Sequence, residues 1–409
     1  MKDEFLPLFE PFDLPSGVRL KNRIVMAPMT HTASHLDGSV SEVEIKYYVR
    51  RARGIAMLIT GSASVMANGG FPGSAAADRD ELIPGLRNLA SAIQSVGTKA
   101  VLQIAHGGRK CPQFIDDIVG PSSVPEPKEG AIVPRELTAE EIPDIIRAFG
   151  EATRRAIEAG FDGVEIHGAN GFLIEQFYSP HANRRDDEWG GSRNERMRFP
   201  LAVVDEVRRV VQLHVKKSFI VGYRITPEEA GTPGITMDDT LALVQALALK
   251  KMDYLHVAQN DIWSGPQFAN GDTRPCLEII KETAGNLPII GVGSIRTAEN
   301  AAQALQTGVP LIALGRELIM DPEWLKKIAQ GREDDIKTKL VIIPRRKFQC
   351  EEKVLRMRQD LLMSRAPLPV RALMPQSSSA RCALFGKTCT AMRSVSLAAM
   401  RIVWRWRPD

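Results

Sequence analysis

Residues 163–173 read Gly-Val-Glu-Ile-His-Gly-Ala-Asn-Gly-Phe-Leu, an apolar run that ends on a histidine and, three residues later, an asparagine. The continuous apolar character of Gly163–Gly168 is typical of a strand that is buried on both faces of a parallel sheet. His167 and Asn170 then offer two neutral donors that can hold an oxygen of a flat ligand and stabilise negative charge there. Taken alone, the segment is also compatible with a structural histidine.

Short apolar runs alternate with amphipathic stretches eight times along the chain. Most of the runs are continuously apolar, which indicates a parallel sheet covered on both faces. Eight such units predict an α/β fold, a closed (β/α)8 TIM barrel. An open doubly wound sheet is the main alternative, but its G-x-G-x-x-G fingerprint does not follow the first strand. The predicted strands are Ile24–Met29, Ile55–Gly61, Lys99–His106, Gly163–Gly168, Phe219–Ile225, Tyr254–Gln259, Pro288–Ile295 and Leu311–Leu318.

Local signals mark the ends of several helices. Thr138–Glu141 and Thr236–Asp239 are predicted to be capping boxes that open helices. Gly285 and Gly308 follow helical stretches, where C-terminal caps belong. The segment Phe12–Arg23 is predicted to form a small hairpin that plugs the amino-terminal end of the barrel, with its turn at Pro-Ser-Gly.

The composition excludes several classes of protein. With 44% hydrophobic and 25% charged residues the chain has an ordinary globular composition, and no stretch approaches the roughly 18 uncharged apolar residues of a membrane span. The five cysteines show no C-x-x-C spacing, which disfavours a disulfide framework, a zinc site or an iron–sulfur cluster. Together with acidic residues near the N-terminus, this predicts a cytoplasmic protein without a metal site.

The charge is unevenly distributed. Residues 345–409 carry 14 Lys/Arg and 4 Asp/Glu, a net charge of +10, so residues 1–344 carry −6. We therefore predict a barrel over 1–344 and an irregular basic tail over 345–409. Three interpretations of the tail stay open: a disordered extension, a product of a reading-frame error, and an anion-binding or nucleic-acid-binding tail, of which the last is least favoured.

Polar residues stand at the ends of the predicted strands, which in a barrel of this kind all face one mouth. The first strand ends in Pro28, Met29 and Thr30, whose hydroxyl can meet a ligand edge. Gln103 can donate and accept at once, as the edge of a flavin pyrimidine ring requires. Arg224, on a buried strand, is costly unless it meets an anion, and beside N1 and O2 of a flavin it would stabilise the reduced form.

The last two strands carry the signals of a phosphate site. Gly293 and Ser294 follow strand seven, and Gly315 and Arg316 follow strand eight. The loops after these strands are the recurrent phosphate site of the architecture, because glycine lets backbone N–H groups approach and arginine pairs with the phosphate. The ligand should thus carry one phosphate here and a flat polar ring over the other strands, and FMN fits that description.

Together these residues resemble the Old Yellow Enzyme family of FMN-dependent NADH:flavin oxidoreductases and ene-reductases, over about residues 5–340. The motifs that carry the resemblance are Asn22–Thr30, Gln103–Arg109, His167–Gly171, Gln176–Ser192 and Gly315-Arg316. The resemblance implies that FMN is reduced by NADH or NADPH, and that flavin N5 then passes a hydride to an electrophilic acceptor. Quinones, nitro compounds, flavins and activated alkenes are such acceptors.

The resemblance also implies roles for single residues. His167 and Asn170 would be catalytic, bind the oxygen of the acceptor and also approach the flavin, with His167 among the cofactor contacts. Thr30 would lie near the flavin C4 oxygen and the substrate. The remaining flavin contacts would come from Pro28, Met29, Gln103, Arg224, Gly293, Ser294, Gly315 and Arg316.

Three features depart from the family pattern. Phe172 stands where many members have a tyrosine that protonates the substrate carbon, so weak activity on simple enones is expected. Ser62 takes a flavin-side position usually held by Gly or Ala. The tail after about residue 344 does not resemble the family ending.

Two other functions remain as alternatives. The first is a phosphate-binding barrel without redox activity, of the aldolase or isomerase type; Lys99 begins its strand, which argues against a Schiff-base lysine. Glu165, two residues before His167, is interpreted as structural. The second is a protein that binds partners through its tail. The partners expected on the main interpretation are a small-molecule electron acceptor and, in a homo-oligomer, further copies of the chain.

Overall fold

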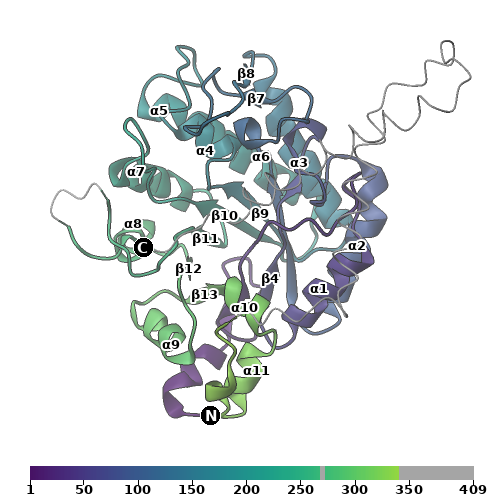
Figure 1. The fold of residues 1–409 in the computed structure, drawn as a ribbon, viewed down its shortest axis with the longest axis vertical. Coiled ribbons are helices and arrows are strands. Elements are labelled where there is room, and N and C mark those ends of the chain that lie inside the picture. The colour runs from purple at the N-terminus through teal and green to yellow at the C-terminus, as the bar shows by residue number, and fades with distance from the viewer. Residues whose placement is uncertain (268–271, 340–409) are drawn as a thin grey trace, which may run out of the picture. The chain divides into compact units, whose positions relative to one another are not determined.

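The computed structural model describes residues 1–267 and 272–339, which form a parallel barrel surrounded by helices (Figure 1). Each strand of the barrel is parallel to its neighbours, and the pairings of β13 with β3 and of β4 with β6 close the ring. The predicted (β/α)8 fold is thus confirmed. The barrel strands are β3 (Ile24–Met26), β4 (Met57–Ile59), β6 (Lys99–Ala105), β9 (Gly163–Gly168), β10 (Ile220–Ile225), β11 (Tyr254–Val257), β12 (Ile289–Val292) and β13 (Leu311–Leu314).

Helices cover the outside of the ring, and shorter elements decorate its ends. The helices are α1 (Glu42–Ala52), α2 (Ile83–Gln94), α3 (Ile142–Glu158), α4 (Leu173–Tyr178), α5 (Arg193–Arg196), α6 (Arg198–His214), α7 (Met237–Ala248), α8 (Cys276–Ala284), α9 (Ala298–Gln306), α10 (Arg316–Met320) and α11 (Trp324–Ala329). The short strands are β1 (Phe12–Asp13), β2 (Arg19–Leu20), β5 (Ala63–Ser64), β7 (Val119–Gly120) and β8 (Arg135–Glu136). The 3-10 turns are η1 (Asp3–Phe9), η2 (Ala67–Gly69), η3 (Asp80–Leu82), η4 (Gly108–Lys110) and η5 (Glu333–Asp335).

Most strands are shorter than predicted. The first ends at Met26 rather than Met29, and the eighth at Leu314 rather than Leu318. Apolar character continues past the last ladder pair because the loops at the mouth are themselves packed, so hydrophobicity overestimates the length of the strand. Pro28 and Met29 consequently lie in a loop beyond β3.

The helix caps are predicted with mixed success. Thr236 and Asp239 form a reciprocal capping box at α7, and Gly285 and Gly308 follow α8 and α9 with positive φ of 59° and 84°. The Thr138–Glu141 box is wrong in its geometry. Glu141 is itself the N-cap of α3, and its carboxylate accepts the Thr138 N–H at 2.8 Å.

The predicted hairpin is confirmed and closes one end of the barrel. β1 and β2 pair antiparallel. Leu14, Val18 and Leu20 pack with inward-facing apolar side chains of the barrel strands. The Asp253 carboxylate, beside the start of β11, accepts the Ser16 N–H at 2.7 Å and so attaches the turn to the barrel. The opposite, carboxyl-terminal end of the strands remains available for a site.

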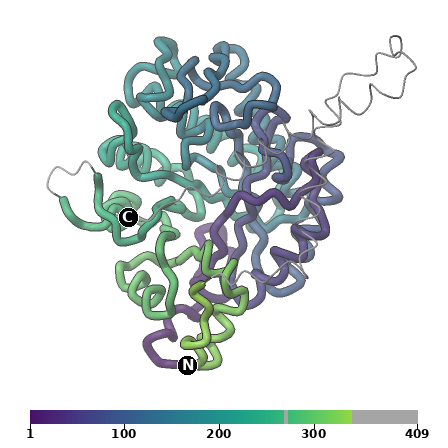
Figure 2. Tube along the Cα trace, in the orientation of Figure 1, coloured from purple at the N-terminus to yellow at the C-terminus, as the bar shows by residue number. Residues whose placement is uncertain are grey.

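The first and the last described segments lie side by side (Figure 2). The Lys2 ammonium is 3.8 Å from a Glu299 carboxylate oxygen and 3.1 Å from one of Glu333. The predicted boundary at 344/345, the basic tail and its three cysteines lie outside the described residues; Cys111 and Cys276 are buried free thiols.

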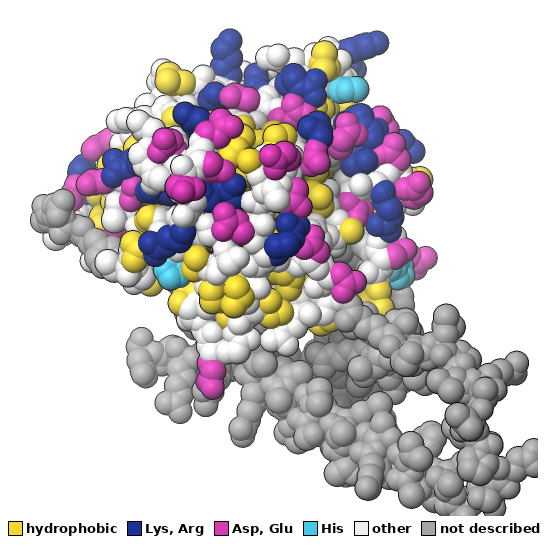
Figure 3. Space-filling model, turned by 90° about the horizontal axis from the view of Figure 1, so that it is seen from above, with side chains coloured by type: hydrophobic (Ala, Val, Ile, Leu, Met, Phe, Trp, Pro, Cys, Tyr) yellow, Lys and Arg dark blue, Asp and Glu magenta, His cyan; other side chains and the backbone are white. Residues whose placement is uncertain are grey.

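The described part of the chain contains no helix that is both long and apolar enough to span a bilayer. It also shows no group of three or more His, Cys, Asp or Glu side chains arranged to hold a metal ion. On the face seen in Figure 3, basic and acidic side chains are interspersed rather than separated.

Candidate functional site

A cavity of about 200 Å³ opens at the carboxyl ends of the barrel strands. It brings together seven of the predicted site residues, which come from four different strand ends. They are Pro28, Met29, Arg224, Gly293, Ser294, Gly315 and Arg316. The side chains of Gln259, Asn260, Arg296 and Glu317 also line it, and the sequence analysis did not identify them.

The backbone of the loop after β12 is shaped so that a bound group can approach it closely. Gly293 has φ of 135°, and a Cβ there would lie 2.8 Å from the Ile262 backbone nitrogen. Ser294 has φ of 50°, and its hydroxyl donates to the Asn260 carbonyl at 2.9 Å. Only glycine fits at position 293, so the backbone can come close to a bound group.

An acidic residue lies at the same end of the cavity. Glu317 follows Arg316 on α10, and its Oε2 is buried without a hydrogen-bond partner among the described residues. Burial raises the pKa of Glu317 to about 7, although Arg296 and Arg316 act in the opposite direction. A carboxyl group with a pKa of about 7 is about half protonated at neutral pH, so it repels a phosphate less than a fully ionised carboxylate would.

Arg224 gives the strongest indication that the cavity binds a ligand with acceptor atoms. Its side chain lines the cavity, and its Nε is buried without a hydrogen-bond partner among the described residues. Burial lowers its pKa, while the charge of Glu165 acts to raise it. A buried guanidinium donor without a partner is costly, so the site suits a ligand with acceptor atoms above β10.

His167 is held as a neutral donor. It is 5% exposed, and burial, followed by the charge of Arg224, lowers its pKa well below the ordinary value. Its Nδ1 accepts the Ala169 N–H at 3.3 Å, so the proton of the neutral ring is on Nε2. His167 can therefore donate a hydrogen bond to a ligand oxygen at neutral pH.

Asn170 lies in a turn close to His167 and adopts a left-handed backbone conformation. It has φ of 58°, its side chain is exposed, and its backbone N–H donates to the Thr226 hydroxyl at 2.8 Å. The Thr226 hydroxyl in turn donates to Glu175 at 2.7 Å. Asn170 tolerates this left-handed conformation, which directs the chain away from β9.

His167, Asn170 and the remaining predicted site residues do not line the 200 Å³ cavity. Thr30 is exposed and Ser62 is buried. Gln103 lies deeper in the barrel, where its Nε2 donates to Glu165 at 2.7 Å. Phe172 packs between two rings, with centroids 4.4 Å from His167 and 5.5 Å from Phe71.

The sequence analysis missed a buried polar network. His256, on β11, places Nδ1 2.9 Å from a carboxylate oxygen of Glu165, and neither side chain is exposed. The signal was available, since His256 is a polar residue on a predicted buried strand, as Arg224 is. Burial lowers the pKa of His256, so it is neutral and donates to the carboxylate.

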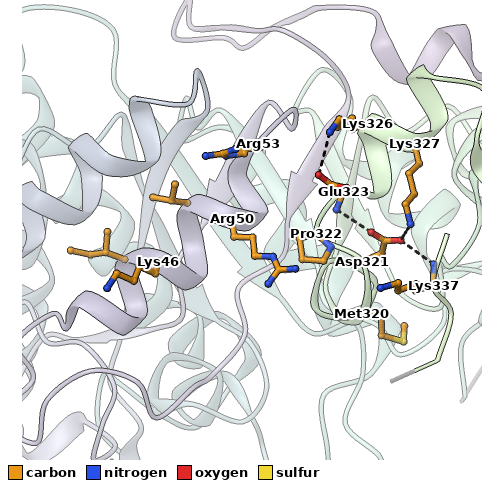
Figure 4. A pocket seen from close by; sticks show the side chains of 12 residues that line it. Lys46, Arg50, Arg53, Met320, Asp321, Pro322, Glu323, Lys326, Lys327 and Lys337 are labelled. Carbon is orange, nitrogen blue, oxygen red and sulfur yellow. Dashed lines mark hydrogen bonds and ion pairs between the residues drawn. The ribbon is translucent and has the colours of Figure 1, made fainter. Parts of the chain in front are cut away.

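A larger cavity of about 780 Å³ lies away from the barrel mouth, between α1 and the segment Met320–Lys327 (Figure 4). None of the predicted site residues lines it. Its acidic residues are occupied: Asp321 binds Lys327 at 2.5 Å and Glu323 binds Lys326 at 3.2 Å. The smaller cavity therefore remains the candidate site.

The residues of the smaller cavity fit FMN. The Arg224 Nε lacks a partner where the flavin ring would need a donor, and Gly293 and Gly315 leave backbone accessible where the phosphate would lie. Arg316, at the start of α10, supplies positive charge at that end.

Comparisons with known proteins agree with this geometry. A family described as "NADH:flavin oxidoreductase / NADH oxidase family" matches residues 7–335. The probable NADH-dependent flavin oxidoreductase YqiG of Bacillus subtilis is 49% identical over 357 residues, which are 86% of this chain and 95% of that protein. The NADPH dehydrogenase of Geobacillus is 35% identical over 322 residues, 78% of this chain and 92% of that protein.

A solved structure and a longer relative are also similar to this chain. The X-ray structure of the Old Yellow Enzyme homologue from Zymomonas mobilis superposes with a TM-score of 0.71 at 25% identity, covering 82% of this chain and 95% of that one. The NADH:fumarate oxidoreductase of Klebsiella pneumoniae is 45% identical over 80% of this chain, but the match spans only 36% of that protein.

Proposed function

Because the chain belongs to the NADH:flavin oxidoreductase / NADH oxidase family, within the Old Yellow Enzymes, we propose that His167 and Asn170 hold the oxygen of its electron acceptor. The enzyme is an NADH- or NADPH-dependent flavin oxidoreductase with FMN as its cofactor. Bound FMN would supply the redox chemistry, the transfer of a hydride equivalent from the nicotinamide to the acceptor. The proposal concerns what the residues of this chain contribute.

The hydrogen bond at His167 Nδ1 is the observation that carries this proposal. Because Nδ1 accepts the Ala169 N–H, the ring proton is on Nε2, from which it can be donated to an acceptor oxygen. Asn170, three residues on, supplies an amide N–H₂ from the same turn. Two donors at one oxygen stabilise the negative charge that develops there as the acceptor is reduced.

The chemical class of electron acceptor that we propose is based on the lack of a hydroxyl group on Phe172. Its ring cannot donate a proton, and the neighbouring ring of Phe71 cannot either. We propose that preferred acceptors are quinones, nitro compounds and flavins, whose reduction places protons on oxygen or nitrogen. Simple activated alkenes, which need a proton on carbon, would react more slowly.

The flavin contacts are likewise proposed. Arg224 and Gln103 would bind the pyrimidine side and Gly293, Ser294, Gly315 and Arg316 the phosphate; Pro28, Met29, Thr30 and Ser62 would border the ring. The shared cavity of seven of these residues supports this assignment.

The alternatives are weaker. Lys99 opens β6 at the end opposite the cavity, and its ammonium is 3.0 Å from Asp162, so it does not serve as a Schiff-base lysine of an aldolase. A function through the tail concerns residues outside the described ones. A cytoplasmic location and a homo-oligomeric state stay predictions, which fractionation and light scattering would test.

The decisive test is the visible spectrum of the purified protein during anaerobic titration with NADH and NADPH. A flavin spectrum that bleaches establishes the reductive half-reaction. Acceptor turnover is then compared for wild type, His167→Ala and Asn170→Ala. We expect losses of about 10²–10³ in kcat/KM for quinones, with bleaching by NADH retained. Unchanged turnover in both variants would refute the proposed role of the pair.

A further inference from the structure

A buried carboxylate lies inside the barrel directly below the proposed flavin site. Glu165, on β9, is 0% exposed. It accepts hydrogen bonds from Gln103 Nε2 at 2.7 Å and from His256 Nδ1 at 2.9 Å. Burial acts to raise its pKa, but His256, Arg224 and Gln103 outweigh burial, so the pKa lies below the ordinary value and the group is ionised.

The strand register places the Glu165 carboxylate next to Gln103 and one layer below His167 and Arg224. Side chains alternate in and out along a strand, so inward-facing residues form layers in the barrel. The upper layer, toward the mouth, holds His167, Arg224 and His256, which are register partners. The layer below it holds Gln103, Glu165, Gly222 and Tyr254, which are also register partners.

Gly222 makes room for this arrangement. A Cβ at this position would lie 2.1 Å from the Tyr254 ring carbon Cζ, so the ring occupies the space that a side chain of β10 would otherwise fill. Burial, followed by the charge and hydrogen bonding of Glu165, raises the pKa of Tyr254 well above its ordinary value, so its neutral hydroxyl faces the carboxylate. The layer is thus built around Glu165 rather than filled with apolar side chains.

Glu165 determines which way the Gln103 amide points. An ionised carboxylate only accepts hydrogen bonds, so the amide must present its N–H₂ to Glu165. The Gln103 oxygen then remains as the acceptor for a ligand. A flavin pyrimidine ring carries an N–H donor between two carbonyls, and such a donor needs an acceptor of this kind.

Glu165 also balances the positive charge of Arg224. The attraction of Glu165 favours the charged guanidinium. In the low dielectric of a barrel interior, a carboxylate one layer below the site offsets part of the field that Arg224 exerts on a bound ring.

We propose that Glu165 is a positioning residue that holds Gln103 in its acceptor orientation and moderates the charge of Arg224, and so tunes the affinity and the midpoint potential of bound FMN. This replaces the structural role expected from the sequence. It rests on the proposed function, because it assumes that FMN lies over Gln103 and Arg224.

The test compares the holoenzyme with Glu165→Gln, which is nearly isosteric but uncharged. FMN affinity is measured by quenching of flavin fluorescence, and the two-electron midpoint potential by dye equilibration. We expect at least tenfold weaker FMN binding, because Gln103 loses its fixed orientation. The midpoint potential of FMN should rise. Without the negative charge of Glu165, the full positive charge of Arg224 acts on the cofactor and favours its reduced form, which carries more negative charge. A tenfold change in the ratio of affinities for the two redox states corresponds to about 30 mV.

Asp253→Asn is the matched control. Asp253 is also a buried carboxylate that accepts two hydrogen bonds, from the backbone nitrogens of Ser16 and Val221, but it lies at the plugged end of the barrel. This variant should lose stability and keep the potential of wild type. A shift in Glu165→Gln no larger than that in Asp253→Asn overturns the inference.

A second variant keeps the inference testable if Glu165→Gln does not fold. His256→Leu removes the donor that, with Arg224 and Gln103, holds the pKa of Glu165 down against burial. The carboxylate should then lose negative charge, so the potential should rise, as it does in Glu165→Gln. An unchanged potential here, or a fall, also overturns the inference. If the wild-type protein binds no FMN, the proposed function is refuted. If the wild-type protein binds FMN that NADH bleaches, but the variants change neither FMN affinity nor midpoint potential, only the role of Glu165 is refuted.

Discussion

The ring of Phe172 lies against the ring of His167, with centroids 4.4 Å apart and planes inclined by 32°. An apolar ring therefore borders the residue proposed to hold the acceptor oxygen. Phe71 stacks on the other side of Phe172 at 5.5 Å, which restricts the freedom of the ring. The proposed pocket thus has a hydrogen-bonding pair on the β9 turn and an apolar wall without a proton donor next to it.

The proton-donor prediction concerns Phe172→Tyr. The new hydroxyl should raise the rate on simple enones by about 10²-fold, the usual size of a positioned general acid, and change the rate on quinones little. Stopped-flow measurement of the oxidative half-reaction with both acceptors checks this. Phe71→Tyr serves as a control of the same chemistry one ring further away. No gain in the enone rate for Phe172→Tyr would contradict the proton-donor explanation.

The affinity prediction concerns Arg224→Met. Loss of a buried charged donor to the flavin should weaken FMN binding by about 1.5–3 kcal/mol, or roughly 10- to 150-fold. Equilibrium titration of the apoprotein with FMN measures it. Arg209→Met is the control, because Arg209 is an exposed residue of α6 that pairs with Glu206 at 2.7 Å. Equal affinities in the Arg224 variant and wild type would place the flavin elsewhere.

The pH prediction concerns Glu175, a buried carboxyl near Glu229. Burial, and then the charge of Glu229, raise its pKa to about 7 from 4.5. A folded-state pKa above the unfolded value means that the stabilisation is complete below pH 4.5 and is lost as the pH rises through 7. The full loss amounts to about 3 kcal/mol at 1.36 kcal/mol per unit.

Urea denaturation of Glu175→Gln between pH 5 and pH 8 tests this expectation. The variant should lose a large part of the decline in unfolding free energy that wild type shows as the pH rises, and Glu317, whose pKa is also raised to about 7, should account for much of the rest. Glu42→Gln, which changes an exposed carboxylate on α1, should keep the decline of wild type. A Glu175 variant whose stability still declines with pH as steeply as wild type would show that another group is responsible.

The packing prediction concerns Gly222→Ala. The added methyl group would lie 2.1 Å from the Tyr254 ring, so the ring must move out of the layer that surrounds Glu165. We expect a loss of about 1–3 kcal/mol in unfolding free energy, with weaker FMN binding. Gly231→Ala is the control, because an added methyl there meets nothing within 4 Å. Full stability of Gly222→Ala would show that the ring has room to relax.

Much of the architecture could be predicted because it depends on sequence patterns that span only a few residues. The runs of apolar residues, the Thr236–Asp239 capping box and the glycines after α8 and α9 depend on interactions within a few residues. The site was predictable in part for the same reason. Arg224, Gly293 and Arg316 stand at strand ends, and in a closed parallel barrel all such ends meet at one mouth.

The pairing of Glu165 with Gln103 and His256 was not predictable in this way. These residues come from three strands, and His256 lies 91 positions beyond Glu165 in the chain. Which side chains meet depends on the register between strands, and a shift by one residue would turn each side chain to the other face. The sequence by itself therefore determined the barrel, its hairpin plug and the residues at its mouth, because periodicity and capping act locally. Only the tertiary structure decided that a buried carboxylate meets Gln103 and His256, because that depends on strand register and on the space left by Gly222.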